Sequence, residues 1–93
     1  MSEWSMIIPQ HVPESFGAMV GFIYLLHFCS GDELYYCDAD FRCWHCEEEM
    51  PDVAQFIVES HIIHDDLILG RGNERAYRHT KEPGDVIFPL PEG

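Results

Sequence analysis

The segment Phe41–Met50, with the sequence FRCWHCEEEM, decides how the chain is interpreted. It places two residues between Cys43 and Cys46 and follows this pair with three glutamates. Two cysteines at this spacing can bind a metal on a tight turn, exchange a disulfide, or lie in a core without any chemistry. The choice among these depends on which other ligands the chain can bring to the pair.

Residues 51–66 give the clearest helical signal in the chain. Pro51 suits the first helical position, where its missing N–H costs nothing, and Asp52 lies where the helix dipole favours an acid. His61 and His64 are three residues apart, so both should project from one face of this helix. The residues at helical spacing that should share this buried face are Val53, Phe56, Ile57, Ser60, His61 and His64.

Zinc prefers four tetrahedral ligands drawn from thiolate and imidazole, so a cysteine pair before a helix that bears two histidines predicts one structural Zn²⁺. The predicted ligands are Cys43, Cys46, His61 and His64. Shells in which another side chain replaces a histidine remain open, and the alternates are Cys37, Cys29 and His45.

Two families share parts of this pattern. The run from Phe41 through Cys43-x2-Cys46 to His61-x2-His64 resembles a zinc finger with two cysteines and two histidines. Residues 34–64 also resemble a B-box zinc module, whose further Cys-x2-Asp pair is similar to Cys37 and Asp40. The 14 residues between Cys46 and His61 depart from the finger spacing. The resemblance implies a zinc-binding segment, and His27 with Cys29 is the only material for an additional ligand pair.

The rest of the chain predicts a single α+β domain over residues 1–93, with an extended arm (1–15), a core (16–88) and a tail (89–93). Two apolar runs, Met19–Cys29 and Leu34–Cys43, flank a turn signal and predict a β-hairpin. A buried helix over Ser15–Phe28 is the competing interpretation, because periodicity does not settle a continuous apolar run. Residues 75–78 and 85–88 predict a short C-terminal strand pair.

The charge of the chain is strongly acidic, with a net charge of −12. All of this excess lies in residues 1–70, where Arg42 is the only Lys or Arg. Such a field repels nucleic acid and favours a partner protein with a basic surface. The acids expected to meet that partner are Glu47, Glu48, Glu49, Asp38, Asp40, Asp65 and Asp66.

The sequence contains no Gly-rich phosphate loop, no Gly-x-Ser-x-Gly and no His-Glu-x-x-His motif. We therefore predict a small acidic, zinc-stabilised protein-interaction module without catalytic activity. One alternative is an inhibitor whose carboxylates mimic nucleic acid and occupy a basic cleft. A second is a thiol-disulfide oxidoreductase that uses Cys43 and Cys46, although Glu47–Glu49 are expected to raise the thiol pKa and oppose reactivity.

The N-terminus has no basic region typical of a signal peptide. The apolar run Gly17–Cys29 is shorter than the about 20 residues of a membrane span. The expectation is therefore a cytoplasmic, intracellular protein.

Overall fold

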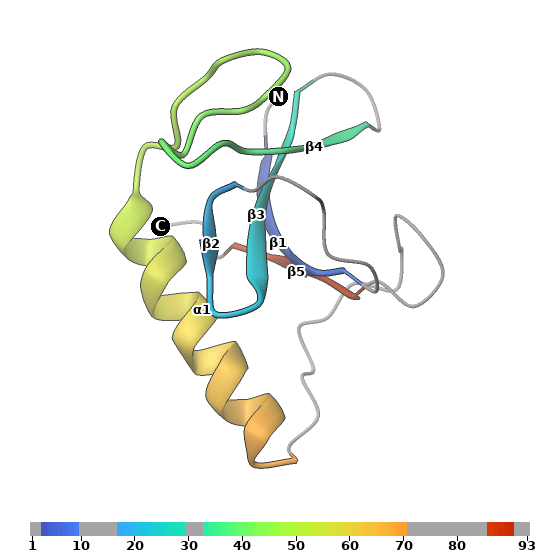
Figure 1. Cartoon of the computed structure of the whole chain (residues 1–93), viewed down its shortest axis with the longest axis vertical. Helices are drawn as coiled ribbons and strands as arrows, with labels where there is room; N and C mark the ends of the chain where they lie inside the picture. Colours follow the sequence, from blue (N-terminus) through green and yellow to red (C-terminus); the bar gives the residue numbers. More distant parts are fainter. Residues whose placement is uncertain (1–2, 10–16, 30–32, 71–85, 91–93) are drawn as a thin grey trace.

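The structure is a computed structural model that describes residues 3–9, 17–29, 33–70 and 86–90. Within these ranges an antiparallel sheet of five strands packs beside one helix (Figure 1), which confirms the α+β prediction. The elements in chain order are β1 (Glu3–Ile8), β2 (Met19–Val20), β3 (Ile23–Phe28), β4 (Leu34–Tyr36), α1 (Val53–Ile68) and β5 (Val86–Pro89).

Strand β3 lies at the centre of the sheet. The main path runs β2-β3-β1-β5, and β4 also pairs with β3, so β3 has β1 on one side and both β2 and β4 on the other. Every residue from Ile23 to His27 is buried. Burial on both faces explains why this stretch of sequence is a continuous apolar run rather than an alternating one.

The predicted hairpin is present, because β3 pairs antiparallel with β4 in the register Leu26↔Tyr36. The competing helix does not form in the described part of its range, where residues 19–20 and 23–28 are strands. The sequence interpretation missed a second turn at Gly21, which has a φ of 61° and separates β2 from β3. Glycine adopts this left-handed conformation at little cost, so it divides the apolar run in two.

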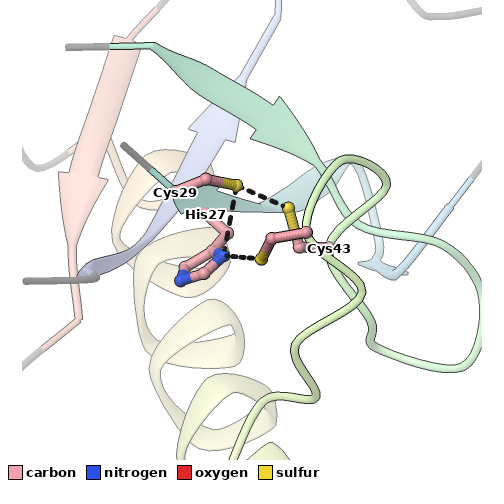
Figure 2. Close-up of side chains that lie close together, drawn as sticks. His27, Cys29 and Cys43 are labelled. Carbon is pink, nitrogen blue, oxygen red and sulfur yellow. Dashed lines mark hydrogen bonds between the residues drawn. The ribbon is translucent and has the colours of Figure 1, made fainter. Parts of the chain in front are cut away.

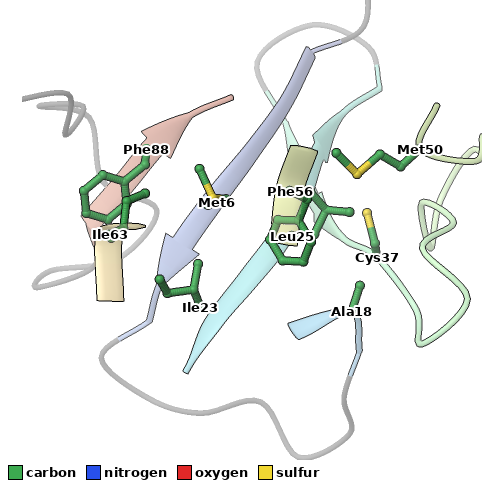
Figure 3. Close-up of a cluster of buried hydrophobic side chains, with 9 residues drawn as sticks. All are labelled: Met6, Ala18, Ile23, Leu25, Cys37, Met50, Phe56, Ile63 and Phe88. Carbon is green, nitrogen blue, oxygen red and sulfur yellow. The ribbon is translucent and has the colours of Figure 1, made fainter. Parts of the chain in front are cut away.

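The main core lies between the sheet and α1 (Figure 3). It contains Met6 from β1, Leu25 from β3, Phe56 and Ile63 from α1, and Phe88 from β5. A second cluster around Ile7, Tyr24, Leu26 and Ile87 occupies the alternating positions of the same strands, and so lies on the other face of the sheet. The sheet is therefore buried on both faces, and only one of these faces meets α1.

Helix α1 differs from the prediction at its start and in its rotation. Asp52 is the N-cap, with its carboxylate accepting a hydrogen bond from the Gln55 N–H at 3.0 Å, so Pro51 lies before the helix. The helix continues to Ile68, and Gly70 follows with a φ of 74°. Its buried residues are Phe56, Glu59, Ser60 and Ile63.

The predicted inner face of α1 is therefore wrong in part, because Ile57 and His61 are exposed. Apolar side chains occur on nearly every side of this helix, including Ile57, Val58 and Ile62, so the helical spacing alone did not select a single buried face.

The ends of the described chain meet in the sheet. The N-terminal arm contributes β1, and β5 pairs with β1 in the register Met6↔Phe88. The predicted partner strand at residues 75–78 lies outside the described residues. No helix among the described residues is long and apolar enough to cross a membrane.

Candidate metal centre

His27 and Cys29 come from the end of β3. Side chains alternate along a strand, so His27 continues the row of Ile23 and Leu25, which face α1. His27 itself is fully buried, and Cys29 is half-buried. An imidazole and a thiol thus extend the main core at one end of the central strand.

Residues 37–43 form the turn that brings the chain back toward β3. The Asp38 carboxylate accepts hydrogen bonds from the backbone N–H groups of Asp40 at 2.9 Å and Arg42 at 3.1 Å. Phe41 has a φ of 63°, which lets the chain reverse, and Cys37 then pairs with Cys43 in an antiparallel bridge. Asp38 therefore acts within this turn and helps to place the cysteine pair.

The Cys43–Cys46 pair occupies a second, tighter turn. The Cys43 carbonyl accepts a hydrogen bond from the Glu47 N–H at 2.9 Å, and the Cys43 N–H donates to the Glu48 carbonyl at 2.9 Å. Glu47 takes the left-handed position of the turn with a φ of 64°. The His45 N–H points at the Cys43 sulfur, 3.4 Å away. Backbone donors aimed at a sulfur favour its thiolate form, which is the form that binds a metal.

The two pairs converge on one point (Figure 2). Figure 2 shows the side chains of His27, Cys29 and Cys43 pointing toward one another. The potential ligand atoms of these three residues and of Cys46 all lie within 4.8 Å of one another. The Nδ1 atom of His27 is 3.6 Å from the Cys29 sulfur and 3.4 Å from the Cys46 sulfur. The sulfurs of Cys29 and Cys43 are 2.9 Å apart. The group lies close enough to hold one zinc ion.

These separations can be compared with those of a tetrahedral zinc shell. Bonds of about 2.3 Å to sulfur and 2.0–2.1 Å to nitrogen place a sulfur and a nitrogen about 3.5 Å apart, and two sulfurs about 3.8 Å apart. Both distances from His27 to sulfur match this geometry. The Cys29 and Cys43 sulfurs would have to move about 0.9 Å further apart to reach the sulfur–sulfur distance of this shell. Three thiolates and one imidazole are also the donor types that zinc selects.

His27 is held in place by its neighbours in the sheet. Its ring stacks on Trp4 of β1, with ring centroids 4.0 Å apart. Its Nε2 atom lies 3.1 Å from a Glu48 carboxylate oxygen, but that oxygen is off the N–H direction, so the contact is electrostatic rather than a well-directed hydrogen bond. A carboxylate beside the second ring nitrogen is the usual support of a metal-bound histidine.

The ionisation of these groups follows from burial and hydrogen bonding. Burial lowers the pKa of His27, against the opposing pull of Glu48, and thereby favours the neutral ring that a metal requires. Burial raises the pKa of Cys29 to about 12, with the hydrogen bonds to Cys43 and Cys46 acting in the same direction.

Cys43 differs from Cys29, because its pKa is lowered. Burial opposes ionisation there, but hydrogen bonds from the Cys29 thiol and the backbone outweigh it. The expectation that the glutamates raise the pKa of this thiol is therefore wrong at Cys43, because hydrogen-bond donors to the sulfur lower it.

The structure brings together only part of the predicted ligand set. Cys43 and Cys46 belong to the group, and so does the alternate Cys29. His61 is exposed on α1. The His64 ring packs edge-on against the Phe22 ring, with the ring centroids 5.0 Å apart. Neither histidine joins a metal-ligand group among the described residues. The reason is the rotation of α1, which presents Ser60 and Ile63 inward instead.

The other two alternates also lie outside the group. Cys37 is buried in the main core, where burial raises its pKa. His45 is exposed, and its ring stacks on Tyr35 with centroids 4.3 Å apart. The sequence offers His27 only for an additional ligand pair with Cys29, and not for the shell that contains Cys43 and Cys46. The His27-x-Cys29 spacing was the available signal, since positions two apart on a strand share a face.

The acids predicted to contact a partner lie in two places, residues 38–49 and helix α1. Glu47, Glu48, Glu49, Asp40 and Asp65 are exposed. Glu49 forms an ion pair with Arg42 at 3.0 Å. Asp38 and Asp66 are half-buried. Contact of any of these acids with a partner stays a prediction.

Comparisons with models of protein families, with curated proteins and with solved structures found no match to this chain.

Proposed function

We propose that this protein is a small zinc-stabilised module that acts by binding another protein. The observation that carries the proposal is the convergence of His27, Cys29, Cys43 and Cys46 within 4.8 Å. His27 and Cys29 lie at the end of β3, and the turn that carries Cys43 and Cys46 begins 14 residues after Cys29. One ion would therefore cross-link the sheet to the loop that leads into α1. Structural zinc contributes directly to folding free energy in small domains.

Four protein ligands leave the ion no open position for water or substrate, which supports a structural rather than a catalytic role. Zinc would supply a cross-link here, while the chain's own residues orient it. Trp4 fixes the plane of the His27 ring, Glu48 faces its outer nitrogen, and the His45 N–H supports the Cys43 thiolate.

An exposed aromatic side chain next to exposed acids supports the binding role. Trp44, at the tip of the cysteine turn, is 73% exposed, and three exposed glutamates follow it closely. Exposed aromatic side chains are common anchors of protein interfaces. An acidic surround favours a basic partner.

Thiol-disulfide exchange is a second candidate, because the lowered pKa of Cys43 is a property of reactive thiols. The Cys43 sulfur belongs to a side chain that is only 1% exposed, however, whereas the attacking thiol of such enzymes must be accessible. An insulin-reduction assay that compares the reduced protein with Cys43→Ser tests this role. Equal rates would remove it.

The primary test measures zinc in protein purified without added metal. We expect about one zinc per chain, and we expect a strong chelator to lower the midpoint of thermal unfolding because the ion is part of the fold. Zinc content near zero, together with an unchanged melt, would contradict the zinc part. The binding role needs a separate test. Proteins that the zinc-loaded chain captures are purified one by one, and each is mixed with the chain alone to see whether the two form a complex. If none of the captured proteins binds the chain in isolation, the proposed binding role is contradicted.

A further inference from the structure

The side of α1 that faces away from the sheet carries two rows of apolar side chains, with the exposed His61 and Asp65 between them. Figure 1 shows α1 at the margin of the molecule, with the sheet on one side of it. We define the outer face of α1 by five apolar residues with exposed fractions of 38–67%: Ile57, Val58, Ile62, Ile68 and Leu69. Leu67 is also 38% exposed, but it lies four residues after the buried Ile63, on the inward side, and is not part of this face. A surface helix normally carries polar side chains on this side, so an apolar outer face marks a contact surface.

The outer face follows helical geometry along the whole of α1. Val58, Ile62 and Leu69 lie at spacings of four and seven residues, and Ile57 and Ile68 lie eleven apart on the adjoining row. His64 extends this surface toward Phe22 on the β2–β3 turn, which is itself 42% exposed. An apolar stripe with this spacing is complementary to another helix, whose ridges fit between its side chains.

The charge of the residues around the outer face indicates what kind of partner helix would bind there. The charged residues of α1 and its N-cap are Asp52, Glu59, Asp65 and Asp66, and this helix contains no Lys or Arg. Two copies of this face would bring like charges together, which disfavours a homodimer. Helices that lie on membranes are typically rich in Lys and Arg, so the acidic surround also disfavours a lipid surface. A basic helix remains as the complementary partner.

We propose that the outer face of α1 docks an amphipathic helix whose apolar stripe is flanked by Lys and Arg residues. This inference rests on the proposed function and specifies its partner. The zinc group supports the same surface through the core: the Met50 N–H donates to the Phe41 carbonyl at 2.9 Å, and the Phe41 ring packs against Phe56 of α1. The loop that carries Cys43 and Cys46 therefore helps to seat α1.

The test uses the zinc-loaded full chain and a fluorescent peptide of about 18 residues, or five helical turns, in which Leu and Lys form an amphipathic helix. Matched probes are a Leu/Glu peptide of the same pattern and a scrambled Leu/Lys peptide. Fluorescence anisotropy should show binding of the first probe at least about tenfold tighter than that of either control, since apolar and charge complementarity are both needed.

The paired variant Val58→Ser/Ile62→Gln removes two exposed side chains of the outer face without touching the core. We expect it to weaken binding of the Leu/Lys peptide at least about tenfold. Met19→Gln is the matched control, because Met19 is similarly exposed, at 47%, and lies on β2. Its affinity should stay within about twofold of the parent, because Met19 lies outside the proposed interface.

Equal binding of the scrambled or Leu/Glu peptide, or an unchanged affinity in the paired variant, would overturn the proposal. A dimer that forms through Val58 and Ile62 in sedimentation equilibrium would also overturn it, as would tighter binding to phosphatidylserine vesicles than to the peptide. Zinc is measured in the same preparation. One zinc per chain without peptide binding defeats only this inference, whereas absence of zinc defeats the proposed module whatever the peptide does.

Discussion

At the scale of single residues, the four cysteines have distinct environments. Cys29, Cys43 and Cys46 meet His27 at one point, whereas Cys37 packs in the main core among apolar side chains. Its pKa is raised by burial, so it stays a protonated thiol. The local spacing marks Cys43 and Cys46 as a pair, but only the path of the chain after β4 shows that Cys29, and not Cys37, joins them.

Cysteine-to-serine substitutions should separate these roles. Cys29→Ser removes one thiolate from the shell, so we expect zinc affinity to fall by at least about 100-fold. Cys37→Ser is the matched control and should retain about one zinc per chain. Competition with a chromogenic chelator measures both affinities. An equal loss of zinc affinity in Cys29→Ser and Cys37→Ser would contradict the assignment of Cys29 as a ligand. A loss of zinc affinity in His61→Ala or His64→Ala would contradict the proposed set of four ligands.

Zinc binding should release protons, because thiols must ionise to bind the metal. The pKa of Cys29 is raised to about 12, so this thiol is protonated near neutral pH and must give up its proton. Cys43, whose pKa is lowered, contributes less than a full proton, and His27 with its lowered pKa contributes none. We expect at least about one proton to be released per zinc at pH 7, and an affinity that falls as pH falls.

Isothermal titration calorimetry in buffers of different ionisation enthalpy counts these protons. Release of no protons would show that thiolates are not the ligands.

At the scale of elements, the loop from Cys37 to Met50 depends on close backbone contacts. Gly17 has a φ of 77°, and a Cβ placed on it would lie 2.5 Å from the Cys37 carbonyl oxygen. That oxygen accepts a hydrogen bond from the Ala18 N–H at 3.1 Å. A glycine before β2 thus lets the chain approach the start of the loop that carries Cys43.

Gly17→Ala tests this approach, with Gly70→Ala as the matched control. Both positions have a left-handed φ, so each alanine should cost about 1 kcal/mol of unfolding free energy. Only Gly17 also meets backbone, whereas nothing lies within 4 Å of the added Cβ at Gly70. We therefore expect Gly17→Ala to be about 2 kcal/mol more destabilising than Gly70→Ala in urea unfolding of the zinc-loaded protein. Equal losses would contradict a close contact at Gly17.

The elements also show what periodicity can predict. The β3–β4 hairpin followed from two aromatic and β-branched runs around a turn signal, and the helix followed from Pro51, Asp52 and the acids before it. The rotation of α1 did not follow. Phe56 and Ser60 are buried as predicted, but Ile57, Val58 and Ile62 are as apolar as Ile63, so tertiary packing and not spacing determined that Ile63 is the buried one. The prediction of His61 and His64 as ligands depended on that orientation of α1.

At the scale of the whole molecule, the sequence predicted Cys43 and Cys46, with Cys29 as an alternate, among the four residues that lie close enough to hold a metal. The Cys43–Cys46 pair is a local motif, visible within four residues. His27 and Cys29 join it because β3 and the following loop meet in space, and pairing across the sheet fixes where β3 ends. A contact between segments 14 or more residues apart has no local spacing rule, so the choice between His27 and the helix histidines required the fold.

The most direct measurement of the central claim is zinc X-ray absorption of the metal-loaded protein. Three sulfurs at about 2.3 Å and one nitrogen at about 2.0–2.1 Å are predicted for a shell of His27, Cys29, Cys43 and Cys46. The nitrogen signal should be replaced by sulfur in His27→Cys, while His64→Ala should leave the spectrum unchanged. A shell of two sulfurs and two nitrogens that changes in His64→Ala would contradict the account.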